Sequence, residues 1–299
     1  MNKIINSDAL DALRKLPDSC CRTCITSPPY YELRDYGTDG QIGLENTPDQ
    51  YIENLVKIFR EVRRVLKDDG TLWVNIGDSY TQKNLNGIPW LLAFALRSDG
   101  WYLRSDIIWQ KPNAMPESVK DRPTRAHEYI FLLSKSSRYH YDAEAVKEPA
   151  VGFYNAAPAG SAGTGKPNAR RRGNSRTFRG GGAYTHDRAQ NNSATVERES
   201  HGLAPNESGK RNRRSVWTIA TRPYKGAHFA TFPEELARPC ILAGSRPGDT
   251  VLDPFAGSGT TGAVAEQEGR DFIGIEINPD YCEIIRQRLD ACCQKGAKP

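Results

Sequence analysis

The stretch TVLDPFAGSGTTGAVAEQEGRDFIGIE, residues 250–276, decides the fold of this chain. Residues 250–253 are a β-prone apolar run, 259–268 follow a glycine-containing turn with a helix-forming pattern, and 271–276 are a second β-prone run that ends in Glu276. A strand, a helix and a second strand in this order form a βαβ unit, whose two strands are parallel. The stretch therefore predicts a parallel sheet with helices packed on its faces.

The same alternation of strands and helices extends beyond this unit. A length of 299 residues suits either one large α/β domain that carries an insertion or two small domains. The predicted fold class is α/β, with a largely parallel sheet, helices on both faces and a loop-rich insertion. The further predicted strands span residues 24–26, 71–76, 105–109 and 129–133, and the further predicted helices span 48–66, 87–98, 233–242 and 279–293.

The alternation stops between residues 141 and 224. Gly, Asn, Ser, Ala and Arg dominate this segment, and parts of it bury too little apolar surface to fold alone. Between residues 141 and 215, thirteen Lys or Arg stand against seven Asp or Glu. Such an excess is typical of a segment that binds a polyanion, although a solvated loop has the same composition. We expect residues 1–140 and 225–299 to form two halves of one domain and 141–224 to form a basic insertion.

A glycine turn follows the predicted strand 250–253. Gly257 and Gly259 let the backbone approach a ligand closely, and the N-terminus of the next helix presents unpaired N–H groups. No lysine follows these glycines, so the phosphate-binding pattern G-x-x-x-x-G-K-[ST] is absent, and the dinucleotide pattern G-x-G-x-x-G lacks its third glycine. Glu276 closes the next strand, where an acidic side chain accepts hydrogen bonds from ribose hydroxyls. The pattern argues against nucleotide triphosphate hydrolysis.

A second motif, Ser27-Pro28-Pro29-Tyr30, follows the predicted strand 24–26. Two consecutive prolines fix an extended turn that leaves its carbonyls free as acceptors. The exocyclic amine of a base is a poor nucleophile because its lone pair is delocalised into the ring. Acceptors at the Ser27 side chain and the Pro28 carbonyl would localise that lone pair, and Tyr30 would stack on the base. A surface turn is the alternative interpretation of the two prolines.

Together the two motifs resemble those of the amino-methylating DNA methyltransferases. The catalytic motif of that family is [DNS]-P-P-[YFW], which residues 27–30 match, and its cofactor motif resembles residues 253–260. The catalytic motif comes first here, an order that resembles the permuted β group. The resemblance covers residues 1–139 and 225–290 and implies a Rossmann-like S-adenosylmethionine-dependent methyltransferase fold. The insertion then occupies the place of the target-recognition region.

The resemblance assigns roles to individual residues. The implied catalytic residues are Ser27, Pro28, Pro29 and Tyr30. The implied contacts to the cofactor, S-adenosyl-L-methionine, are Asp8, Phe232, Pro233, Asp253, Pro254, Phe255, Ala256, Gly257, Ser258, Gly259, Thr260, Glu276 and Asn278. The basic insertion supplies the candidate DNA contacts, which are Arg170, Arg171, Arg172, Arg176, Arg179, Arg211, Arg213 and Arg214.

Polar residues near the predicted cleft have two interpretations each. Asn75 and Asp78 lie at the end of the predicted strand 71–76, where they either cap backbone groups or line the cleft. A second group either approaches DNA near the cleft or pairs within itself at the surface. Its members are Arg122, Arg125, His127 and Glu128.

The predicted function is site-specific methyl transfer from S-adenosylmethionine to N4 of cytosine in duplex DNA, by base flipping and direct transfer. Ser27 resembles the first motif residue of cytosine-N4 enzymes, whereas aspartate is usual in adenine-N6 enzymes, so adenine N6 is the alternative target. Cytosine-C5 methylation needs a thiolate nucleophile, and Cys240 lies in a predicted helix, where we assign it to the core. The remote alternative is a DNA-binding protein that has lost catalysis, which the intact motifs oppose.

Composition limits the partners of the chain. Seven cysteines, an odd number in three clusters, predict reduced thiols. Cys21 and Cys24 form a C-x-x-C pair, but no second such pair and no histidine pair stands at zinc-ligand spacing, so we expect no metal site. Neither a signal-peptide pattern nor a membrane-spanning apolar run is recognisable, so we expect a cytoplasmic protein that associates with the nucleoid through DNA. Double-stranded DNA is the expected partner, a cognate restriction endonuclease is a further candidate, and the chain is expected to act as a monomer or a homodimer.

Overall fold

A computed structural model describes residues 2–33, 35, 37, 40–150, 209–221 and 232–296 of the chain. Residues 1–147 and 212–299 belong to one compact unit, and 148–211 belong to another. In the second unit, strand β8 (Glu148–Pro149) pairs antiparallel with β9 (Lys210–Arg211). The first unit holds all the other strands and the helices of the described residues.

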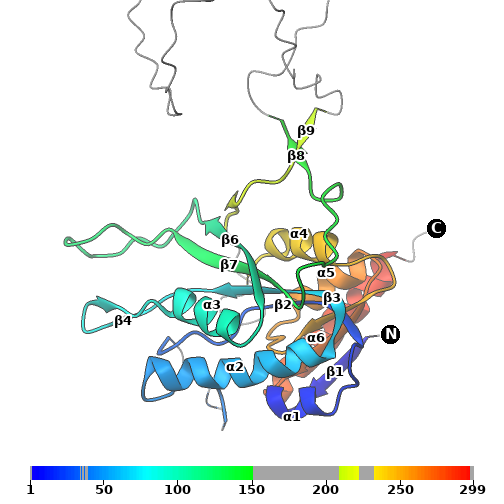
Figure 1. Ribbon diagram of the computed structural model, residues 1–299, viewed down its shortest axis with the longest axis horizontal. Helices are drawn as coiled ribbons and strands as arrows, with labels where there is room; N and C mark the ends of the chain where they lie inside the picture. Colours follow the sequence, from blue (N-terminus) through cyan, green and yellow to red (C-terminus); the bar gives the residue numbers. More distant parts are fainter. Residues whose placement is uncertain are drawn as a thin grey trace, which may run out of the picture. The chain divides into compact units, whose positions relative to one another are not determined.

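An eight-stranded sheet with the order β1-β12-β11-β2-β3-β7-β6-β10 forms the centre of the first unit (Figure 1). The first five strands in this order run parallel to one another, and β10 is parallel to β6. Strand β7 is antiparallel to both of its neighbours. The strands are β1 (Lys3–Asn6), β2 (Cys21–Thr26), β3 (Leu66–Ile76), β6 (Tyr102–Gln110), β7 (His127–Ser134), β10 (Val216–Thr218), β11 (Thr250–Asp253) and β12 (Asp271–Glu276).

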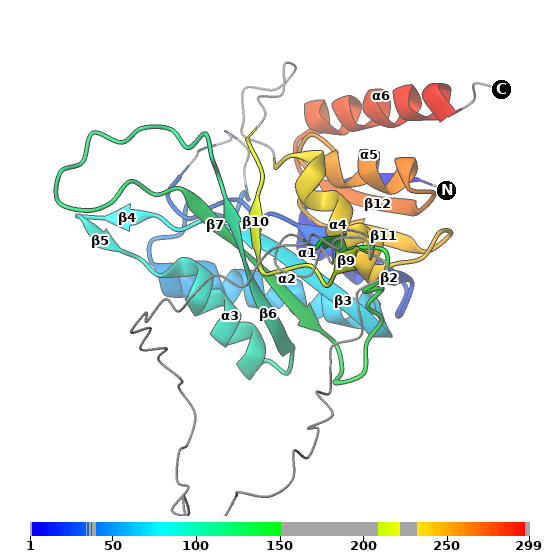
Figure 2. The same ribbon diagram turned by 90° about the horizontal axis from the view of Figure 1, so that it is seen from above.

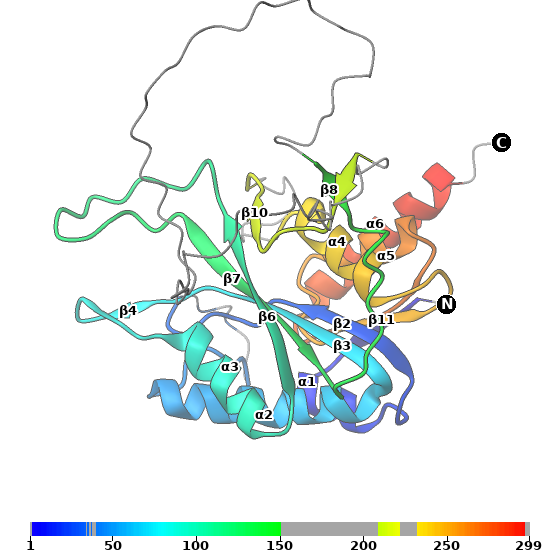
Figure 3. The ribbon, with the colours of Figure 1, turned by 45° about the horizontal axis from the view of Figure 1, so that its top comes forward.

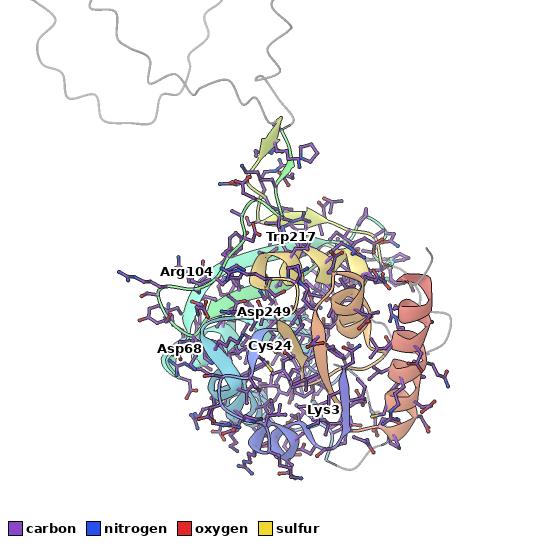
Figure 4. All side chains as sticks on the ribbon, turned by 90° about the vertical axis from the view of Figure 1, so that its right-hand side faces the viewer. Lys3, Cys24, Asp68, Arg104, Trp217 and Asp249 are labelled. Carbon is purple, nitrogen blue, oxygen red and sulfur yellow. The ribbon has the colours of Figure 1, made fainter. Side chains whose placement is uncertain are left out.

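Helices cover both faces of this sheet (Figure 3). One face carries α1 (Ala9–Arg14), α2 (Pro48–Val65) and α3 (Ile88–Ser98), and the other carries α4 (Glu234–Gly244), α5 (Thr260–Gln267) and α6 (Pro279–Gly296). The buried apolar residues divide in the same way, into one cluster around α1, α2 and α3 and a second around α4, α5 and α6. Figure 4 shows Cys24 in the interior, where burial raises the pKa of its thiol well above the usual range.

Helix α2 illustrates how local sequence sets an element. Thr47 caps its N-terminus by accepting a hydrogen bond from the Gln50 amide at 3.2 Å, and Pro48 occupies the first turn. Its apolar positions recur with helical spacing and are buried against the sheet, among them Leu55 and Phe59. No helix of the described residues has the length and apolarity that a membrane span requires.

Several predicted elements coincide with the structure. Strands 250–253 and 271–276 have the predicted bounds, and the predicted helix 48–66 is α2. Strand β3 begins at Leu66 rather than at residue 71, because Leu66 already pairs with Cys21 of β2. The register between the two strands then shifts, so the residues predicted as a turn are included in β3. Several short elements were not predicted from the sequence. These are β1, α1, β10 and the hairpin of β4 (Tyr80–Thr81) and β5 (Asn84–Leu85).

Candidate active site

The two predicted motifs lie at one edge of the sheet, where the parallel strands have their carboxyl ends (Figure 2). Residues 27–30 leave β2, and residues 254–259 leave β11. These strands are neighbours, and Leu252 of β11 lies opposite Cys24 of β2. The structure therefore brings together two motifs that stand near opposite ends of the sequence.

A buried carboxylate joins the two motifs. Asp253 Oδ1 accepts hydrogen bonds from Thr26 Oγ1 at 2.6 Å and from the Phe255 amide at 3.1 Å. Its Oδ2 accepts a hydrogen bond from Thr261 Oγ1 at 2.7 Å. Burial raises the pKa of Asp253 from 3.8 to about 6, in spite of these donors, which lower it. Because both oxygens have partners within the protein, Asp253 fixes the start of the glycine turn beside the strand that leads to Ser27.

The glycine turn depends on its backbone conformation. Gly257 and Gly259 have φ angles of 52° and 78°, in the left-handed region where residues with a side chain are strained. A Cβ at Gly259 would lie 3.0 Å from Ile285 of α6, so the turn packs directly on that helix. Glu276 accepts hydrogen bonds from the Gly257 amide at 2.8 Å and from the Asn278 amide at 2.9 Å. Burial raises the pKa of the Glu276 carboxyl.

Other predicted cofactor contacts lie at the same edge. Asp8 follows β1 and caps α1, where its Oδ1 accepts a hydrogen bond from the Asp11 amide at 3.1 Å. The neighbouring Ser7 amide donates to the Glu276 carbonyl at 3.1 Å, which places Asp8 beside the end of β12. The Ser258 hydroxyl is buried and has no hydrogen-bond partner among the described residues. An orphan hydroxyl inside a glycine turn is suited to meet a polar ligand.

The Ser27-Pro28-Pro29-Tyr30 turn is anchored from two sides. On one side, Tyr51 of α2 donates a hydrogen bond to the Pro29 carbonyl at 2.7 Å. On the other side, the Tyr30 ring packs on the backbone of Gly77, where a Cβ would lie 2.6 Å from Tyr30 Cε2. Gly77 is therefore required for this position of the ring, since any side chain there would displace it.

The Tyr30 hydroxyl belongs to a buried polar network. It donates to Glu128 Oε2 at 2.6 Å and accepts from Asn75 Nδ2 at 2.9 Å. Asn75 Nδ2 also lies 3.1 Å from Glu128 Oε2 and 3.4 Å from Ser27 Oγ. Lys111 forms an ion pair with the other oxygen of Glu128. Burial and the Glu128 charge raise the pKa of Tyr30 well above its usual range, so the phenol remains a donor.

The structure gives contacts for three residues whose interpretation was left open. Asn75 and Glu128 belong to the network beside Ser27, where Glu128 pairs with Lys111 and not within its own predicted group. Asp78 caps α3 by accepting hydrogen bonds from the Gly87 and Ile88 amides at 3.1 and 3.0 Å. Lys111 had no prediction. The signal in the sequence that could have indicated it is its position directly after β6. Because β6 and β7 form an antiparallel pair, the end of β6 lies beside the start of β7, which contains Glu128.

A small cavity of about 10 Å³ lies next to the Ser27-Pro28-Pro29-Tyr30 turn, between the sheet and α4. Thr26, Asn75 and Phe232 are among its lining residues. The Oδ1 atom of Asn75 is buried without a hydrogen-bond partner in the described part of the chain. The cavity has room for about one water molecule.

A DNA methylase family model, which covers N6 and N4 enzymes, matches residues 21–287. The chain belongs to this DNA methylase family. Type II methyltransferase M.Cfr9I of Citrobacter freundii is 47% identical to it, over 96% of this chain and 87% of the relative. Type II methyltransferase M.SmaI of Serratia marcescens is 44% identical, over 96% of this chain and 90% of the relative. The family resemblance predicted from the two motifs is confirmed.

Solved structures share the fold of this methylase. The PvuII DNA methyltransferase (cytosine-N4-specific) matches with a TM-score of 0.66 and 20% identity, over 98% of this chain and 91% of that one. TTHA0409 of Thermus thermophilus, solved in complex with S-adenosyl-L-methionine, matches with a TM-score of 0.63 and 22% identity, over 98% and 94% of the two chains. The predicted methyltransferase fold is confirmed, and the ligand of TTHA0409 is the cofactor predicted for this methylase.

Most predicted DNA contacts of the methylase lie outside the described residues. These are Arg170, Arg171, Arg172, Arg176 and Arg179. In the second unit, Arg211 pairs with Glu148 at 2.9 Å. In the first unit, Arg213 stacks over the Trp217 ring at 4.4 Å, and Arg214 is exposed.

The described cysteines of the methylase were considered for a metal site and, at Cys240, for a nucleophile. Among the described residues, no group of three or more Cys, His, Asp or Glu side chains could hold a metal ion. Cys240 is buried in α4, as predicted for a core residue, and burial raises the pKa of its thiol. Such a thiol stays protonated and is a poor nucleophile.

Proposed function

We propose that this DNA methylase transfers a methyl group from S-adenosyl-L-methionine to an exocyclic amine of a DNA base, with cytosine N4 as the target and adenine N6 as the alternative. The observation that carries the proposal is the hydrogen bond of 2.6 Å from Thr26 to Asp253. It holds the Ser27-Pro28-Pro29-Tyr30 turn directly beside the glycine turn. An amine acceptor site and a cofactor site are thereby adjacent, as direct transfer requires.

The residues around the glycine turn fit the proposed cofactor. Glu276, with its carboxylate fixed by two backbone amides, would accept hydrogen bonds from the ribose hydroxyls. Asp8 and the buried Ser258 hydroxyl supply further polar groups, and Phe232 supplies an apolar surface. The turn residues Pro254, Phe255, Ala256, Gly257, Gly259 and Thr260, with Pro233 and Asn278, complete the proposed pocket. When bound, the cofactor supplies an electrophilic methyl group on a sulfonium ion.

The catalytic turn would activate the amine. Ser27 Oγ and the Pro28 carbonyl accept the two N–H groups, which localises the nitrogen lone pair. The Pro29 carbonyl already accepts a hydrogen bond from the Tyr51 hydroxyl, which fixes the position of the turn. The Pro28 carbonyl would then accept the N–H group of the substrate amine without a rearrangement of the turn. One side of the Tyr30 ring lies against Gly77, and we assign the other side to stacking on the flipped base.

Two observations favour cytosine over adenine. Ser27 stands at the first motif position, where aspartate is usual in adenine-N6 enzymes. The structural neighbour from PvuII is named a cytosine-N4-specific enzyme. We further propose that residues 141–224, including their arginines, read the target sequence, while residues 1–140 and 225–299 provide the two halves of the catalytic domain. The Type II names of the relatives favour a cognate restriction endonuclease as a partner.

Nucleoside analysis tests the proposed function. Unmethylated genomic DNA is incubated with the full chain and S-adenosylmethionine, digested to nucleosides and analysed by mass spectrometry. N4-methylcytosine is the expected product. N6-methyladenine would establish the alternative target, and saturable DNA binding without any methylated nucleoside would establish a protein that has lost catalysis.

A pair of serine variants controls this experiment. Ser27→Ala is expected to abolish most product because it removes an acceptor for the amine. Ser98→Ala, at an exposed serine that ends α3, is the matched control and should retain wild-type yield. Equal yields from both variants would contradict the role of Ser27.

A further inference from the structure

Two segments extend side by side from the active-site edge of the sheet. They are the hairpin region 79–86, which contains β4 and β5, and the loop 111–126 between β6 and β7. Figures 2 and 3 show both reaching out beyond α3 on the same side of the sheet. We call them together the edge platform.

Both segments of the edge platform are continuous in the chain with residues of the polar network around Tyr30. The hairpin region begins at residue 79, four residues after Asn75. The loop begins with Lys111 and returns to Glu128, and these two side chains form the ion pair of the network. The edge platform is therefore connected directly to the residues beside Ser27, where the proposed function places the target base.

Cation–π contacts join the two segments. The guanidinium carbons of Arg122 and Arg125 lie 4.2 and 5.0 Å from the centroid of the Tyr80 ring. Arg125 also donates a hydrogen bond to the Asp78 carbonyl, and Arg122 pairs with Glu117. Each guanidinium has five N–H donors, so these contacts orient the arginines and leave donors for a further acceptor. The two guanidinium groups are thereby held close to one ring, and such a concentration of positive charge attracts anions.

The exposed charges of the edge platform are mainly positive. Apart from Lys111, it carries four cations, Lys83, Lys120, Arg122 and Arg125, against the carboxylates of Glu117 and Asp121. The Lys83 side chain is 90% exposed, and its ammonium lies 3.8 Å from Asp121. Lys83 and its neighbour Gln82 have φ angles of 67° and 50°, in a left-handed turn that places both at the tip of the hairpin.

We propose that the edge platform binds the phosphate backbone of DNA beside the target base. This inference rests on the proposed function, and it adds a DNA contact surface formed by residues outside the basic insertion 141–224. Lys83 and Lys120 contact phosphates from the exposed rim, and Tyr80 holds Arg122 and Arg125 ready for a phosphate near the site. Contacts to phosphates position the duplex but do not read its sequence.

The test compares the salt dependence of DNA binding. The variant K83A/K120A removes two exposed cations and leaves both cation–π contacts of Tyr80 in place. The one contact between the segments that it removes is the ion pair of Lys83 with Asp121 at 3.8 Å, which is exposed on both sides and therefore contributes little to joining them. Each phosphate contact contributes about 0.9 to the slope of log affinity against log salt, so the slope is expected to fall by about 1.8. Binding is measured by fluorescence anisotropy on a labelled duplex of mixed sequence. A second variant, Tyr80→Leu, keeps every charge, so it should weaken DNA binding without lowering the slope.

The matched control is R14A/K15A, which removes two exposed cations at the end of α1. Helix α1 leads from the carboxyl end of β1 to the start of β2, so its last residues lie at the opposite edge of the sheet. The control is expected to keep the wild-type slope. A K83A/K120A slope equal to that of wild type or of the control would overturn the proposal, and wild-type affinity of Tyr80→Leu would refute the role of Tyr80. Because these readouts are binding constants, they stand independently of the nucleoside analysis.

Discussion

Glu128→Ala would remove the carboxylate that joins Lys111 to Tyr30, and we expect it to lower the free energy of unfolding by about 3 kcal/mol. The side chains of Glu128 and Lys111 are 13% and 20% exposed, so the substitution leaves an ammonium group with little access to water. Removing one partner of a buried ion pair costs about 3–5 kcal/mol. Lys111 also lies 4.5 Å from the centroid of the Trp109 ring, a contact that stabilises the remaining cation by about 0.5–1 kcal/mol. The expected loss is therefore near the lower end of that range.

Catalysis should decline together with stability in this variant. The Tyr30 hydroxyl loses an acceptor at 2.6 Å, so the ring and the catalytic turn lose their fixed position. We expect kcat to fall by about tenfold or more. The affinity for S-adenosylmethionine should stay unchanged, since Glu128 contacts none of the residues assigned to the cofactor. Glu128→Gln is the matched variant, because its amide oxygen still accepts from Tyr30 while its charge is absent.

Urea denaturation of Glu128→Ala, Lys111→Met and the double variant separates the contributions. Lys111→Met keeps an apolar chain of similar length and removes the cation. The double variant contains no unpaired charge, so it should be at least about 1 kcal/mol more stable than Glu128→Ala. A loss below about 1 kcal/mol in Glu128→Ala, or a double variant that is less stable than Glu128→Ala, would refute the buried ion pair as a source of stability.

Three further substitutions test other contacts. Gly77→Ala would place a Cβ 2.6 Å from the Tyr30 ring, so the ring must shift. The value of kcat should therefore fall by about tenfold while cofactor affinity stays unchanged, and a wild-type kcat would contradict this reasoning. Glu276→Ala should lower the cofactor affinity measured by calorimetry by about tenfold or more, because hydrogen bonds to a charged group contribute about 1.5–3 kcal/mol. An unchanged affinity would show that the cofactor pocket lies elsewhere. The folded-state pKa of Asp253, about 6, lies above the ordinary 3.8, so the folded protein binds this proton more tightly than the unfolded chain does. The resulting contribution to stability is fully present below about pH 4 and is lost as the pH rises through about 6. Urea denaturation should therefore show the stability of wild type relative to Asp253→Asn falling by about 2–3 kcal/mol over this interval, whereas a pH-independent difference would rule out the raised pKa.

The sequence by itself determined the elements with strong local signals. The strands 250–253 and 271–276 are apolar runs bounded by turn residues, and helix 48–66 has a cap and a regular apolar face, so short-range sterics and burial define them. Both functional motifs were equally visible, because glycine and proline restrict the backbone through their own covalent structure. The short β1 is different. Its four residues are exposed or half-buried, and only pairing with β12 makes them a strand.

Tertiary structure alone decided how the motifs are joined and supported. Thr26 and Asp253 meet because β2 and β11 are neighbours in the sheet, and strand order depends on packing of the whole domain rather than on local propensity. Glu128 could equally have been a surface residue by its sequence context. It reaches Tyr30 because β7 runs antiparallel to β3, which brings the beginning of one strand beside the end of the other. The polar network at the site is thus set by sheet topology, since hydrogen-bond partners distant in sequence meet only when the sheet has formed.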